Sequence, residues 1–79
     1  MITLVVHHEN GKVRVTQTRR VTFLPARDGI PAHLVNEAGT DYLADAVFHV
    51  RVRDDGGQVG TVKQGPGGDW EWHLSHREL

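Results

Sequence analysis

The chain has 79 residues, a formal net charge of −1 and no cysteine. This length fits a single domain, residues 1–79, with a free energy of unfolding of only about 0.05–0.15 kcal/mol per residue. Without cysteine there are no disulfides and no thiolate metal sites, and a reducing, cytoplasmic location is expected. The nine basic and ten acidic side chains are balanced, which gives no support to general polyanion binding. No apolar run approaches the roughly 18–20 residues that span a bilayer, and the apolar N-terminus lacks the basic lead-in of a signal peptide.

The N-terminal segment has the pattern of a β-hairpin. Two runs rich in β-branched residues, about 2–8 and 12–18, flank Asn10-Gly11, and Asn-Gly is typical of a two-residue type I′ turn. A turn centred on this dipeptide puts four apolar side chains on one face, which we expect to be the core face. They are Leu4, Val6, Val13 and Val15. A third strand, about 20–24, should follow, with Val21 and Phe23 directed inward.

The segment 31–46 admits two interpretations. Pro31 is typical of a helix start and Gly39 of a helix end, and the residues between them can form about two helical turns. The alternative is a hairpin whose turn is formed by residues 36–39. Of the two, we expect the first, one short helix within 31–46.

Residues 47–75 give the clearest pattern, a meander of three strands. Strand-like runs at about 47–53, 58–64 and 69–75 are separated by the turn-rich segments 54–57 and 65–68. Registers centred on these two turns agree about which side of the meander is apolar. That inward side would consist of Phe48, Val50, Val52, Val59, Thr61, Trp72 and Leu74.

Together these elements predict a mainly β fold, a small antiparallel barrel or sandwich of two three-stranded meanders. The first meander is 2–8, 12–18 and 20–24, the second is 47–53, 58–64 and 69–75, and the short helix lies between them. Each meander has one apolar face, and the simplest way to bury both faces is against each other.

The outward face of the second meander is the first candidate for a binding surface. The same registers place His49 beside Glu71, Arg51 beside His73, and Gly60 between the last two as a bare patch of backbone. A glycine inside a strand often marks the close approach of a ligand or another chain. Trp70 is a second candidate, because it falls near the end of the sheet and exposed tryptophan is enriched at interfaces.

Catalytic and metal sites find little support in the sequence. On a strand, His7 and His8 face opposite sides, and so do His73 and His76, so neither pair can hold one ion without irregular backbone. The G-P-G-G segment lies between two strands and is a hairpin turn, not a phosphate-binding loop. We therefore expect no enzyme activity, no catalytic residues, no cofactor and no metal.

The function that remains is a non-enzymatic protein-interaction module, of which a small inhibitor or adaptor of a larger protein complex, of the mobile-element type, is one specific form. A partner protein would bind through His49, Arg51, Arg53, Trp70 and His73. The alternative is a small β-barrel that binds nucleic acid through its arginine-rich sheet face. A histidine-based metal-binding protein is a third interpretation, no membrane partner is expected, and a homo-oligomer stays open.

Overall fold

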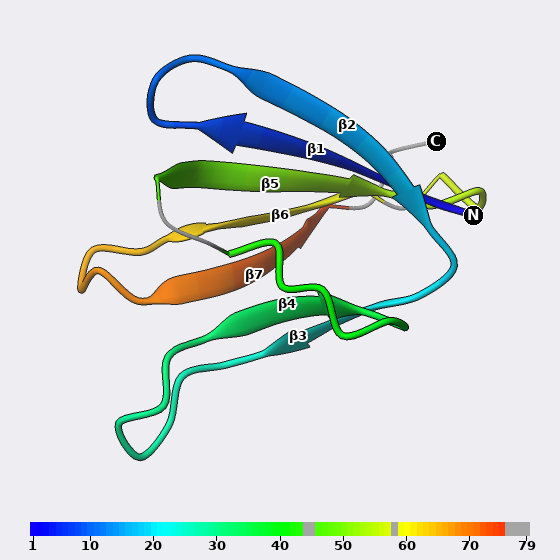
Figure 1. The fold of residues 1–79 in the computed structure, drawn as a ribbon. Helices are drawn as coiled ribbons and strands as arrows, with labels where there is room; N and C mark the ends of the chain where they lie inside the picture. Colours follow the sequence, from blue (N-terminus) through cyan, green and yellow to red (C-terminus); the bar gives the residue numbers. More distant parts are fainter. Residues whose placement is uncertain (44–45, 58, 76–79) are drawn as a thin grey trace.

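The computed structural model of the chain describes residues 1–43, 46–57 and 59–75, and within these residues it is all β (Figure 1). The seven strands are β1 (Ile2–His8), β2 (Val13–Thr18), β3 (Val21–Leu24), β4 (His33–Asn36), β5 (Val47–Arg53), β6 (Val59–Gln64) and β7 (Trp70–Ser75). Five of them form an antiparallel sheet in the order β2-β1-β5-β6-β7, and β3 pairs with β4 in a separate hairpin. The predicted mainly β, antiparallel fold is confirmed. Gln58, predicted to open the strand 58–64, and His76 lie outside the described residues.

The barrel alternative is wrong, because β2 and β7 remain the two edges of an open sheet. The second predicted meander is confirmed as β5-β6-β7, whereas the first is wrong in its third strand. β3 leaves the sheet after β2 and pairs with β4, and the free side of β1 pairs with β5 instead. This last pairing joins the N-terminal hairpin and the C-terminal meander into one sheet.

The predicted helix within 31–46 is also wrong, since β4 occupies His33–Asn36 and no helix occurs among the described residues. The cause lies upstream, at Asp28 and Gly29, which both have positive φ (51° and 78°) and form a two-residue hairpin turn. The amides of Arg27 and Ile30 donate to each other's carbonyl oxygens at 3.1 and 2.8 Å, so the chain returns antiparallel to β3. The hairpin alternative is the correct one: the Gly39 amide donates to the Asn36 carbonyl oxygen at 3.0 Å.

Four turns share one construction, and three of them set the registers of the main sheet. Each is a four-residue turn whose last residue, Gly11, Gly39, Gly57 or Gly68, has a φ between 83° and 88°. In each, the glycine amide donates to the carbonyl oxygen three residues earlier. This is a three-residue hairpin loop, in which only the glycine occupies the left-handed region. A loop of three residues shifts the pairing of the two strands by one residue relative to a loop with an even number of residues.

The displaced registers turn β2 and β6 over relative to the prediction. Val5 pairs with Val15 and Val50 pairs with Val62. Turns centred on Asn10-Gly11 and on residues 54–57, as predicted, would instead have paired Val15 with Val6 and Val50 with Thr61. Because side chains alternate across a strand, a shift of one residue moves every side chain of that strand to the opposite face. Val13 and Val15 are therefore exposed rather than in the core.

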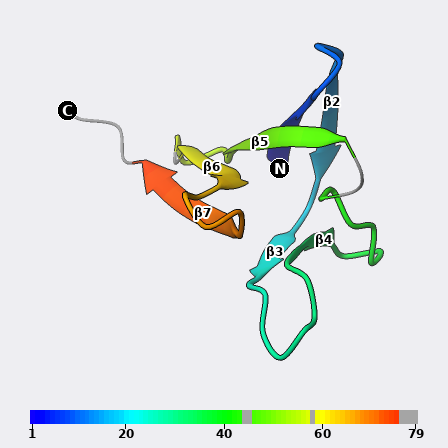
Figure 2. The same ribbon diagram turned by 90° about the vertical axis from the view of Figure 1, so that its left-hand side faces the viewer.

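The core lies between the inner face of the sheet and the β3–β4 hairpin, which covers that face as a second layer (Figure 2). Leu34 of β4 is fully buried against Leu4, Val50 and Val62 of the sheet. Other members are Val6, Tyr42, Val47 and Val52, with Ile2, Val21, Phe23, Leu43, Trp70 and Trp72 packed around them. The predicted inward direction of Val21 and Phe23 is thus confirmed.

Gly60 belongs to this inner layer and not to the outward patch predicted for it. It is buried, and a Cβ placed on it would lie 2.8 Å from Cζ2 of Trp72. The glycine therefore makes room for the indole, which also meets Phe23 at a ring-centroid distance of 6.4 Å. Packing against Trp72 therefore explains why this position has no side chain.

Two carboxylates fix the hairpin layer. Asp41 accepts hydrogen bonds from the amides of Leu34 (3.1 Å) and Leu43 (3.0 Å) and lies 2.6 Å from Nδ1 of His33. Glu37 accepts a 2.5 Å hydrogen bond from the hydroxyl of Thr18, at the end of β2, and this bond with neighbouring backbone amides lowers the pKa of Glu37 to about 2. The hairpin is thereby joined to the sheet by a polar contact as well as by its apolar face.

Candidate functional site

The side of the five-stranded sheet that faces away from the hairpin is not covered by any described part of the chain, and we call it the open face. Its side chains form three rows across the strands. The first row is Val13, His7, His49, Lys63 and Glu71; the second is Val15, Val5, Arg51, Thr61 and His73; the third includes Gln17, Thr3 and Arg53.

The structure brings together four of the five residues predicted to bind a partner. His49, Arg51, Arg53 and His73 share the open face, because the shifts at the two turns cancel and leave the alignment of β5 with β7 unchanged. Trp70 does not join them. It pairs with Gln64, is half-buried and packs against the core from the inner face.

Phe48 reaches the open face through a β-bulge. The β1–β5 register passes from His8–Val47 to His7–His49, so Phe48 is an extra residue without a partner on β1. The bulge lets Val47 enter the core and turns Phe48 outward, where it is 63% exposed. The prediction that Phe48 points inward is therefore wrong.

Two imidazole rings lie stacked next to the bulge. His7 and His49 pair directly across β1 and β5, with ring centroids 4.2 Å apart and planes inclined by 20°. Burial of the His49 ring, and then the charges of His7, Arg51 and Lys63, lower its pKa below the ordinary value. Nε2 of His7 is buried and has no hydrogen-bond partner. The fold thus favours the neutral form of the His49 ring within this stack.

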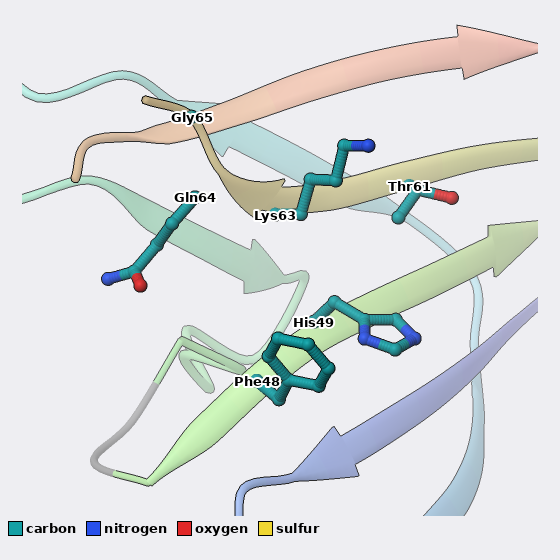
Figure 3. A pocket seen from close by; sticks show the side chains of 6 residues that line it. All are labelled: Phe48, His49, Thr61, Lys63, Gln64 and Gly65. Carbon is teal, nitrogen blue, oxygen red and sulfur yellow. The ribbon is translucent and has the colours of Figure 1, made fainter. Parts of the chain in front are cut away.

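A shallow cleft runs beside this stack, from the bulge towards the β6–β7 turn (Figure 3). It is lined by Phe48, His49, Thr61, Lys63, Gln64 and Gly65 and has a volume of about 430 Å³. Phe48 meets His49 edge-on, with ring centroids 5.0 Å apart, so the aromatic wall of the cleft is continuous with the histidine stack. The opposite wall is polar and comes from β6.

The charge of the open face is positive over β5 and β6. Arg51, Arg53 and Lys63 are exposed there, and within the described part of the chain none of them forms an ion pair. Glu71 is the one carboxylate of the first row. Its Oε1 lies 3.2 Å from Nε2 of His73, and it forms no ion pair with Lys63. The cationic groups therefore remain available to an anionic group from outside.

The opposite half of the open face, over β1 and β2, carries exposed apolar side chains among polar ones. Val13 and Val15 of β2 are 54% and 63% exposed, and Val5 of β1 lies beside Val15 in the same row. Together with Phe48 they expose large apolar side chains on the same face as the free cations. Sequence reasoning missed this patch, because it placed both valines and Phe48 in the core.

Among the described residues no three His, Asp or Glu side chains come close enough to hold a metal ion, and no described helix is long and apolar enough to cross a membrane. No family model, curated protein or solved structure matches the chain. The open face itself is therefore the basis for a functional interpretation.

Proposed function

We propose that the chain is a protein-interaction module that binds a partner protein through the open face. The observation that carries the proposal is the exposure of Val13, Val15 and Phe48 on one side of one sheet. Their apolar surface is accessible to water in the free chain, and several large apolar side chains exposed on one face support an interaction site there.

The composition of the open face fits this role. Interfaces are rich in aromatic residues and arginine, and their strongest contacts come from such side chains surrounded by less important neighbours. Phe48, Arg51 and Arg53 are of these types, and the valines of β2 add apolar area beside them. A partner surface that combines apolar and acidic side chains would be complementary to both halves of the face.

The module would act by covering a surface of its partner, without chemistry of its own. A small inhibitor or adaptor of a larger complex works in this way, and the size of the chain suits it. We propose that this chain is such an inhibitor or adaptor.

The test is affinity capture from the host lysate, with and without nuclease, using the wild-type chain and two sets of variants. Val13→Ser with Val15→Ser, and Arg51→Glu with Arg53→Glu, should each abolish capture of the partner while leaving the melting temperature nearly unchanged, because all four side chains are exposed. Arg27→Glu, on the exposed tip of the β3–β4 hairpin, is the matched control and should capture normally. Capture that persists in both double variants would refute the open face as the binding site.

Single-stranded nucleic acid is the second candidate, and the outward position of Phe48 favours it. An exposed ring beside His49 and Lys63 on an open sheet is the kind of stacking platform on which bases pack. This hypothesis predicts that the chain binds an oligonucleotide and that log Kd increases linearly with the logarithm of the salt concentration. Absence of binding at low salt, or capture that resists nuclease, would exclude it.

A further inference from the structure

We propose that the cleft between Phe48 and Lys63 receives an aromatic side chain of the partner that is adjacent to a carboxylate. This inference rests on the proposed function and adds the chemistry of the ligand. It follows from three features of the cleft: an exposed ring on one wall, a free ammonium group on the other, and hydrogen-bonding groups between them.

The aromatic wall is suited to a second ring. Phe48 is held in place by the bulge and touches His49 edge-on, yet most of its own surface is exposed. Aromatic pairs prefer offset or edge-to-face contacts at centroid distances of about 4.5–7 Å, and each contributes about 0.5–1.5 kcal/mol beyond its buried area. A cleft of about 430 Å³ accommodates one indole or phenol ring together with its neighbouring residue.

The polar wall is suited to a carboxylate. Lys63 lines the cleft from β6 and extends towards β7, with Thr61 and Gln64 on either side of it (Figure 3). Glu71, which pairs with Lys63 in register, is directed towards His73 and the backbone of Gly65, so it leaves the ammonium group unneutralised. An incoming carboxylate would supply the missing negative charge, and Arg51 in the next row would add to the attraction.

The apolar half of the open face favours a peptide over a nucleotide. A nucleotide also offers a ring beside an anion, and it would satisfy the cleft alone. However, Val5, Val13 and Val15 continue the same surface without any cation, and a phosphate chain crossing them would lose its water without compensation. A polypeptide has apolar side chains to place there.

Titration of the ¹⁵N-labelled chain with short capped peptides tests the inference by NMR. The peptide Asp-Trp-Glu should shift the amide signals of Phe48, His49 and Lys63, with a Kd on the order of 1 mM as expected for so few contacts. The control peptides Lys-Trp-Lys and Asp-Leu-Glu remove the charge and the ring in turn and should bind at least about tenfold more weakly. Equal shifts with either control, no shift with Asp-Trp-Glu, or tighter binding of a thymidine trinucleotide would overturn the inference.

Variants separate this inference from the proposed function. Phe48→Ala and Lys63→Gln change exposed side chains, so both should keep the wild-type melting temperature and lose peptide binding, whereas Val15→Ser should retain it. If the peptide fails to bind but Val13→Ser with Val15→Ser still abolishes capture of the partner, the open-face proposal stands and the cleft inference falls. If neither measurement responds, both fall.

Discussion

Replacing Gly60 with alanine tests the packing of the sheet against the indole of Trp72. The new methyl group would lie 2.8 Å from Cζ2 and 3.1 Å from Cη2 of the ring. Favourable carbon–carbon contacts begin at about 3.5 Å, so the ring must retreat by roughly 0.7 Å. It cannot retreat freely, because its other neighbours include Phe23 and the core cluster.

The expected loss of stability follows from two opposing terms. Overpacking of this kind costs about 1–3 kcal/mol, and removing a glycine from a strand gains about 0.5–1 kcal/mol. The middle values of these ranges, about 2 and about 0.75 kcal/mol, give a net loss of about 1.25 kcal/mol for Gly60→Ala, measured by urea unfolding at neutral pH. For a domain of this size the whole free energy of unfolding is about 4–12 kcal/mol, so the change is readily observed.

A double-mutant cycle identifies the cause. Trp72→Phe replaces the two fused rings of the indole by one smaller ring and removes the atoms Cζ2 and Cη2. Alanine at position 60 should therefore be tolerated in that background. The two substitutions should be less destabilising together than the sum of their separate effects, with a coupling energy of at least about 0.5 kcal/mol. Strict additivity, or a Gly60→Ala variant as stable as the wild type, would refute the packing argument.

Three further predictions concern the hairpin layer, the acid range and the stacked histidines. Leu34→Ala empties the fully buried position that joins the hairpin to the sheet, so urea unfolding should show a loss of about 2–5 kcal/mol; a loss below about 1 kcal/mol would contradict the assigned core. The pKa of Glu37 is lowered from 4.5 to about 2, so its stabilising effect is complete above pH 4.5 and is lost as the pH falls towards 2. Glu37→Gln should therefore melt at a lower temperature than the wild type at neutral pH and approach it in acid, and parallel melting curves across that range would count against the Thr18 contact. The pKa of His49 lies below its ordinary 6.5, so folding favours the neutral ring and stability decreases as the pH falls below 6.5. The melting temperature of His49→Gln should depend less on pH between about 7.5 and 5.5 than that of the wild type, and identical slopes would contradict this.

The strands of the main sheet were predictable because alternating apolar residues identify them directly. The alternation of Val50 and Val52 with Arg51 and Arg53 was enough to place the arginines outward. The alignment of β5 with β7 was correct for another reason: the register errors of the two hairpins cancel, so His49 and His73 still share the predicted face. The predicted core face was wrong at Phe48 and also at Val13 and Val15 of β2, which are exposed.

Registers were not predictable, because they depend on whether a turn contains two residues or three. Asn10-Gly11 is compatible with a symmetric type I′ turn, but only Gly11 adopts positive φ in the structure. The apparent agreement between the two C-terminal hairpins was not an independent check. Shifting both hairpins by one residue turns over β6 alone. The sequence of β6 has valines at an odd and an even position, 59 and 62, so either register predicts an apolar inward side.

The long-range pairings had no signal in the sequence. Nothing local shows that β3 should leave the sheet or that β1 should pair with β5. The bulge that turns Phe48 outward depends on that second pairing, so it could not be found without it. Two adjacent apolar residues at the start of β5, Val47 and Phe48, were the one hint that either of them could be the inward residue.

The position of β1 has a consequence for how the chain reaches this structure. β1 is synthesised before β5, yet it lies inside the sheet, between β2 and β5. Its hairpin with β2 can form within about 1–10 μs, but its other edge finds a partner only after β5 has been made, and closing so long a loop is slow. Until β5 pairs with it, this edge of β1 keeps its backbone amides and carbonyl groups unpaired. The joining of β1 to β5 is therefore the step we expect to limit the folding rate and at which two incomplete chains would pair with each other instead.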